Sequence, residues 1–223
     1  MPASYTPAMS RRFPLPAALA LLVAALIAVA LALGPCTGPP RENSPEVRFV
    51  REMTQHHAQA VDLATRIRDR SQDPTLRSVA LDILLSQQEQ IGQMRGWLTL
   101  WGLPWGGAGM TAEHARMMGM AAPADLNRLD TLPVKDAERL FLQRMIRHHQ
   151  GALSMVKPAL APGIRPEVQT LARQIQATQT GEIRLMGQML AARGAKPLPA
   201  PAAASDHAGM EGMEMGGGGE HQH

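Results

Sequence analysis

MTQHHAQA (residues 53–60) and MIRHHQGA (residues 145–152) are two versions of one motif, Met-x-x-His-His, in a chain of 223 residues. They begin at Met53 and Met145, 92 residues apart, and the same offset matches further positions without a gap. A constant offset over about fifty residues predicts an internal repeat, whose units bury their apolar faces against each other. The other matched pairs are Phe49 and Phe141, Pro74 and Pro166, Ile83 and Ile175, Gln87 and Gln179, Ile91 and Ile183, Met94 and Met186, and Gly102 and Gly194.

Each unit has the periodicity of a helical hairpin. Apolar residues recur every three or four positions, which is the spacing of one helix face. Asp73-Pro74 is typical of a helix start and Gly102 of a helix end, and Pro166 and Gly194 take these places in the second unit. We predict helices over residues 45–70, 74–101, 134–160 and 166–193. Residues 45–194 would then form an all-α four-helix bundle built from two repeated helical hairpins.

Composition agrees with this class. Aromatic residues make up 3% of the chain and there are 15 methionines, which favours a core of Ala, Leu, Ile and Met over a β-sandwich. The net charge is +3, but Lys and Arg are scattered among acidic residues and form no basic block. We therefore expect no nucleic-acid partner.

The N-terminus predicts an export or membrane element. Residues 1–12 end in Arg11-Arg12, and the apolar segment 13–34 is long enough to cross a bilayer, which takes about 20 residues. An uncleaved signal anchor and a signal peptide cleaved near Ala30–Ala32 both remain open. In either case residues 1–12 stay in the cytoplasm, and the chain after Cys36 lies in the periplasm or on the outer face of the cytoplasmic membrane. With one cysteine there is no internal disulfide framework.

Three further segments are predicted to lie outside the helices. Residues 35–44 are a linker, and residues 103–133 are a connector rich in Gly and Met that joins the two hairpins. Residues 195–223 are a tail rich in Met and His whose composition cannot build a core, so we predict it to be disordered.

The repeated motif places soft donor atoms on one helix face, because residues three and four positions apart are neighbours there. Two adjacent histidines beside a methionine, present twice, predict a metal site. The alternative is that the histidines are hydrogen-bonded core groups and the methionines packing residues, as we expect for Met94 and Met186. The candidate ligands are Met53, His56, His57, Met145, His148 and His149.

Two glutamines in the apolar stripes are candidates to orient these imidazoles. In an antiparallel hairpin that turns near residues 71–73, Gln87 lies at the height of His56, and Gln179 likewise lies beside His148. A buried amide needs a partner, and it can fix the tautomer of a metal-binding histidine.

The donor types favour copper. Thioether sulfur selects Cu(I), imidazole suits Cu(I), Cu(II) and Zn, and we place no carboxylate beside the motifs. Methionine and histidine also bind copper without forming disulfides, which fits a chain with 15 Met and 1 Cys. Neither the oxidation state nor the choice between one shared ion and one ion per unit follows from the sequence.

Auxiliary copper sites are predicted in the connector and the tail. The connector could equally be an apolar lid over the bundle end, and the tail an incidental low-complexity end. The residues concerned are Met110, His114, Met117, Met118 and Met120 in the connector, and His207, Met210, Met213, Met215, His221 and His223 in the tail.

The pattern FxxxMxxHHxxA, the Gln and Met positions and WLTLWG resemble the secreted bacterial family called domain of unknown function 305. The resemblance covers about residues 45–194, and it implies a ferritin-like four-helix bundle outside the cytoplasm, with links to copper binding and tolerance. The first unit departs from it at Ala58-Gln59, where the second has Gln150-Gly151. The matching residues are Phe49, Met53, His56, His57, Ala60, Trp97, Leu98, Trp101 and Gly102, then Phe141, Leu142, Met145, Ile146, His148, His149, Gln150, Gly151 and Ala152.

The sequence thus predicts an extracytoplasmic protein that sequesters copper or transfers it to another protein, with no catalysis. One rival is a metal-free scaffold or adaptor of the cell envelope. The other is a ferritin-like oxidase, which needs Glu and Glu-x-x-His ligands that the motifs do not supply. The membrane would be a partner only through an uncleaved N-terminal segment.

Overall fold

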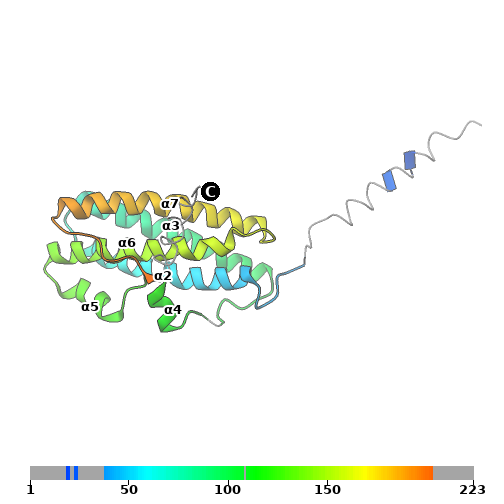
Figure 1. Ribbon diagram of the computed structural model, residues 1–223, viewed down its shortest axis with the longest axis horizontal. Coiled ribbons are helices and arrows are strands. Elements are labelled where there is room, and N and C mark those ends of the chain that lie inside the picture. The colour runs from blue at the N-terminus through cyan, green and yellow to red at the C-terminus, as the bar shows by residue number, and fades with distance from the viewer. Residues whose placement is uncertain (1–18, 21–22, 25–37, 108, 203–223) are drawn as a thin grey trace, which may run out of the picture. The chain divides into compact units, whose positions relative to one another are not determined.

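The computed structural model describes residues 19–20, 23–24, 38–107 and 109–202. In this part of the chain there are no strands, which confirms the all-α class (Figure 1). None of the helices described there is long and apolar enough to cross a membrane. Our expectations for residues 1–12, for most of the apolar segment 13–34 and for tail residues 203–223 lie outside the described residues. The helices are α2 (Pro45–Arg70), α3 (Pro74–Leu100), α4 (Ala112–Met117), α5 (Pro123–Thr131), α6 (Val134–Ala159) and α7 (Pro166–Ala192).

The ends of the four long helices lie within one residue of the predicted ends, because local signals set them. The Ser44 side chain accepts a hydrogen bond from the main-chain N–H of Val47 at the start of α2. Asp73 caps α3 in the same way. At the C-terminal ends of α3 and α7, Gly102 and Gly194 adopt φ values of 70° and 68°, a conformation that glycine takes without strain.

The long helices pack in pairs. α2 lies against α3, α6 lies against α7, and α2 also packs on α6 (Figure 1). The start of α2 shares a buried cluster with the end of α6, as Val50 and Val156 do, so these two helices run antiparallel. Each pair is therefore a hairpin, and the two hairpins meet through α2 and α6.

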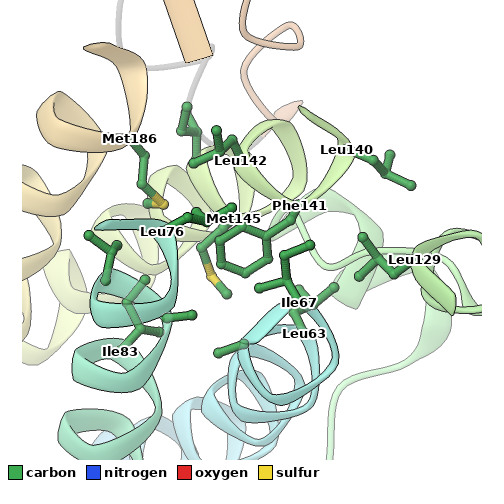
Figure 2. Close-up of a cluster of buried hydrophobic side chains, with 14 of the residues drawn as sticks. Leu63, Ile67, Leu76, Ile83, Leu129, Leu140, Phe141, Leu142, Met145 and Met186 are labelled. Atoms are coloured by element: carbon green, nitrogen blue, oxygen red, sulfur yellow. The ribbon is translucent and has the colours of Figure 1, made fainter. Parts of the chain in front are cut away.

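Two apolar clusters fill the interior. Figure 2 shows one of them, here called the Phe141 cluster, with residues from all four long helices. The other, the Val50 cluster, gathers the opposite halves of the same helices. Leu63, Ile67, Ile83, Phe141, Met145 and Met186 belong to the Phe141 cluster, and Val50, Met53, Met94, Leu98, Val156 and Ile175 to the Val50 cluster.

A buried polar layer separates these clusters. Along each long helix, buried histidines or a buried glutamine fall between the part that joins one cluster and the part that joins the other. Every member is at most 2% exposed. The members of this histidine layer are His56, His57, Gln87, His148, His149 and Gln179.

The connector contains two short helices that we did not predict, α4 and α5. It is fixed to α2 by Gln59, whose amide accepts from the N–H of Ala121 (2.6 Å) and donates to its oxygen (3.0 Å). The connector also lies directly on α6: a Cβ on Gly151 would stand 1.7 Å from the main-chain oxygen of Met118. Gln59 and Gly151, which differ at equivalent positions of the two motifs, thus both serve to hold the connector.

Gly151→Ala tests this contact. The added methyl group would meet backbone, so the connector must move, and we expect a loss of about 1–3 kcal/mol in the free energy of unfolding. Gly187→Ala in α7 is the matched control, because nothing lies within 4 Å of its added Cβ. That change should stabilise the protein by about 0.5–1 kcal/mol. Urea unfolding measures both, and equal effects would contradict the close approach.

Candidate metal centre

The four motif histidines meet at the centre of the molecule, where α2 faces α6. All four side chains are fully buried. The rings of His56 and His148 lie with their centroids 3.6 Å apart and their planes at 31°. His57 and His149 flank this central pair, with ring centroids 6.4 Å from His56 and 6.2 Å from His148 respectively. The two motifs, far apart in sequence, therefore form one cluster of imidazoles.

Every one of these imidazoles directs its Nε2 atom at an oxygen. Because these oxygens accept hydrogen bonds, each Nε2 carries the proton, and in a neutral ring the Nδ1 atom then holds a lone pair. The acceptors are the main-chain oxygen of Met118 for His56 (3.0 Å), Oε1 of Gln90 for His57 (2.7 Å), the main-chain oxygen of His56 for His148 (3.0 Å) and Oε2 of Glu182 for His149 (2.7 Å).

All four Nδ1 atoms are buried and have no hydrogen-bond partner among the described residues. Buried polar atoms in proteins nearly always have a partner, so four unpaired imidazole nitrogens in one layer are unusual. An imidazole whose other nitrogen donates to an oxygen is the arrangement found in metal-binding histidines.

Burial also keeps His56, His57 and His148 uncharged. Desolvation lowers the pKa of His56 to about 3, with a smaller contribution from the neighbouring His57. Desolvation is also the main cause that lowers the pKa of His57 to about 4, against the hydrogen bond with Gln90. The pKa of His148 is well below its usual value for the same reason. At neutral pH these imidazoles are free of the proton that would compete with a metal ion.

The two motif methionines are fully buried but lie apart. Met53 belongs to the Val50 cluster together with Met94, and Met145 belongs to the Phe141 cluster together with Met186. The sulfur-bearing side chains therefore flank the histidine layer on opposite sides, which follows from the antiparallel packing of α2 and α6. Within the described residues, no three His, Cys, Asp or Glu side chains form a ready ligand group around one point.

The glutamines chosen from the sequence do not hold the imidazoles. Gln87 and Gln179 lie in the layer, but their amide atoms have no hydrogen-bond partner among the described residues, so the predicted bonds to His56 and His148 are not formed. The side chains that do pair with histidines are Gln90, with His57, and Glu182, with His149. Gln90 and Glu182 occupy equivalent positions of the two hairpins, 92 residues apart. Glu182 also corrects our statement that no carboxylate lies beside the motifs.

The auxiliary residues of the connector have different surroundings. His114 is 34% exposed, and its Nε2 lies 3.7 Å from Oε2 of Glu52. Met118 contacts His56 through its main-chain oxygen. Met117 is exposed, Met110 is buried and Met120 is half-buried. The auxiliary residues of the tail, from His207 to His223, lie outside the part that the structure describes.

Comparison with known proteins gives a family match. The family model described as "Domain of unknown function (DUF305)" matches residues 46–190 and also residues 152–221. No curated protein matches the chain.

Solved structures of similar proteins extend this match. A DUF305 fragment from Deinococcus radiodurans is 56% identical, with a TM-score of 0.64 over 68% of this chain and 99% of that one. A DUF305 protein from Streptomyces coelicolor, named as secreted, is 40% identical, with a TM-score of 0.66 over 71% and 99%. CopM in its Cu(II)-bound form is 31% identical, with a TM-score of 0.57 over 66% and 95%, and CopM in its Cu(I)-bound form is 28% identical.

The lowered pKa values predict an acid-sensitive metal-free protein. As the pH falls below 6.5, histidines in the unfolded chain bind protons, whereas His57 and His56 in the folded protein stay neutral down to about pH 4 and 3. The unfolded state then binds more protons, so stability falls as pH falls. Between pH 6.5 and 5 we expect the Tm to drop by about 5 °C or more.

A thermal unfolding series over this pH range measures the effect. His57→Gln should reduce the drop, and His114→Ala, at a partly exposed histidine, should leave it unchanged. The carboxylate of Asp73, whose pKa is lowered by hydrogen bonds from the start of α3, titrates at lower pH and does not disturb this window. A Tm that stays constant from pH 6.5 to 5 would show that the buried rings are not the cause.

Proposed function

We propose that this chain, which belongs to the family called domain of unknown function 305, binds copper outside the cytoplasm and sequesters it or transfers it to another protein, without catalysis. The observation that carries the proposal is the set of four buried, unpaired Nδ1 atoms of His56, His57, His148 and His149. They are nitrogen donors whose rings each direct the other nitrogen, Nε2, at an oxygen, as metal-binding histidines do.

Copper is the metal that these donors fit best. Imidazole binds both oxidation states of copper, and the nearby thioethers of Met53 and Met145 favour Cu(I). The relative CopM has been solved in Cu(I)-bound and Cu(II)-bound forms, which supports extending this cargo to the present chain. A zinc site would more commonly include thiolate or carboxylate ligands.

The positions of the methionines support two ions instead of one. Met53 and Met145 belong to clusters on opposite sides of the histidine layer, so a single ion would not reach both sulfurs. We infer one ion on each side, with a thioether from one motif and imidazoles from the layer. In this arrangement copper stabilises the fold, because it provides partners for nitrogens that otherwise have none.

The fold fits storage better than oxidation chemistry. We interpret the four long helices as a ferritin-like bundle made of repeated hairpins, and α7 begins and ends 92 residues after α3. Di-iron oxidases of that fold use carboxylates from all four helices. At the histidine layer, Glu182 is the one carboxylate that pairs with a motif histidine among the described residues.

The place of action is inferred from the N-terminus and the relatives. The Streptomyces coelicolor protein is named as secreted, in agreement with a signal anchor or signal peptide over residues 13–34. Copper tolerance at the membrane surface, by sequestration or by transfer to a separate copper-carrying protein, is the role we assign.

Titration of the full chain with Cu(I) tests this function. We expect two tightly held ions in competition with a Cu(I) chelator, and loss of both in the double variant His56→Ala and His148→Ala. The matched control is His221→Ala with His223→Ala, which also removes two histidines but should keep both tight ions. Circular dichroism checks folding, and His57→Gln with His149→Gln replaces the first variant if it unfolds. Unchanged copper binding in these folded layer variants would favour a metal-free scaffold.

The two hairpins should differ in their preference for oxidation state. His149 donates to a carboxylate, whereas His57 donates to an amide. A carboxylate partner makes the imidazole a stronger donor, which favours Cu(II). We expect Glu182→Gln to weaken Cu(II) binding by about tenfold and to change Cu(I) binding much less.

Gln90→Glu is the reciprocal variant, because it gives the first hairpin the partner of the second. It should strengthen Cu(II) binding there. Electron paramagnetic resonance of Cu(II) and chelator competition for both oxidation states measure these effects. If the two variants shift Cu(I) and Cu(II) affinity equally, the partner of the imidazole does not select the oxidation state.

A further inference from the structure

The histidine layer has no direct contact with solvent. Its four imidazoles are fully buried, and the connector lies over the central pair, with the main-chain oxygen of Met118 3.0 Å from Nε2 of His56. If copper binds at the layer, as proposed above, the ion has to pass groups that cover the imidazoles, and Met118 is one of them. We therefore expect a solvent-accessible groove beside Met118 where a copper ion can bind first.

A groove with that position opens between α2, α4 and α6. It has a volume of about 310 Å³ and an apolar wall that includes Phe49. Met118 lines it as well, so the residue that covers His56 also forms part of the groove. Met118 thus contacts the histidine layer and also lines the groove.

The groove carries donors of the types that copper uses. Glu52, His114 and Met155 line it together with Met118. Nε2 of His114 and Oε2 of Glu52 lie 3.7 Å apart, which is too far for a hydrogen bond, and both side chains are partly exposed, at 34% and 22%. The carboxylate attracts a cation, while imidazole and thioethers favour copper over harder ions.

We propose that this groove is the loading site for copper: the ion binds first to Glu52 and His114, with the thioethers of Met118 and Met155, and then passes under Met118 to His56. This inference rests on the proposed copper-binding function. It adds two residues, Glu52 and Met155, that the sequence pattern does not single out, and it gives His114 and Met118 a transient role distinct from storage.

A second cavity on the other side of the connector is the main competing route. Its volume is about 280 Å³, and it is lined by Gln59, Arg116 and Met120. It has no histidine or carboxylate in its lining, and the guanidinium of Arg116 repels a cation. Arg48 also lines the first groove, but there Glu52 provides the opposite charge.

The test is the rate at which the full chain takes Cu(I) from its complex with bicinchoninate, followed by stopped-flow absorbance. Glu52→Gln combined with His114→Ala should slow loading about tenfold. The number of tightly held ions at the end should stay the same, because the layer is untouched. Arg116→Gln alters the second cavity and should leave the rate unchanged.

The outcomes separate this inference from the proposed function. A wild-type chain that holds no tight copper would contradict the function itself. A wild-type chain that holds copper but loads at the same rate after the Glu52 and His114 changes would overturn the loading site alone. A changed loading rate in the Arg116→Gln variant, or loss of a tightly held ion in the groove variant, would also overturn it. Thermal unfolding of each variant confirms that the fold is intact.

Discussion

The burial of four imidazoles, each with one nitrogen bonded and the other without a partner, is the constraint on which the centre of this molecule depends. An unsatisfied buried polar atom costs about 1–3 kcal/mol, so the layer weakens an interior that is otherwise apolar. Leucine at these positions would pack against the clusters on either side with no such penalty. Histidines at His56 and His148 are therefore hard to explain as packing residues, and a ligand for their free nitrogens accounts for them.

Much of the fold could be predicted from the sequence because its determinants are local. Ser44, Asp73 and the prolines that follow them start helices, and Gly102 and Gly194 end them. The two short helices of the connector could not be predicted in this way, since six and nine residues are too few for a clear periodicity. Their positions depend on contacts with α2 and α6, such as the clamp by Gln59.

The candidate site was predictable in its histidines but not in their partners. The motif spacing places two imidazoles on one helix face, and the structure brings both copies into one layer. In an ideal hairpin Gln87 lies at the height of His56, whereas in the structure His57 reaches the next turn of α3 and pairs with Gln90. Helix periodicity gives the face of a residue, but the contact that a long side chain makes depends on how the helices are staggered, which the sequence pattern does not determine. For the same reason, the sequence pattern did not predict that Glu182 pairs with His149.

Met118 contacts the interior through its main chain and the molecular surface through its side chain. Its carbonyl oxygen fixes the tautomer of His56, and its side chain lines the outer groove. Every residue has this carbonyl group. A substitution at position 118 can therefore change the type of donor atom in the groove, while the ring of His56 keeps its orientation. The side chain at this position can therefore vary independently of the hydrogen bond that orients the His56 ring.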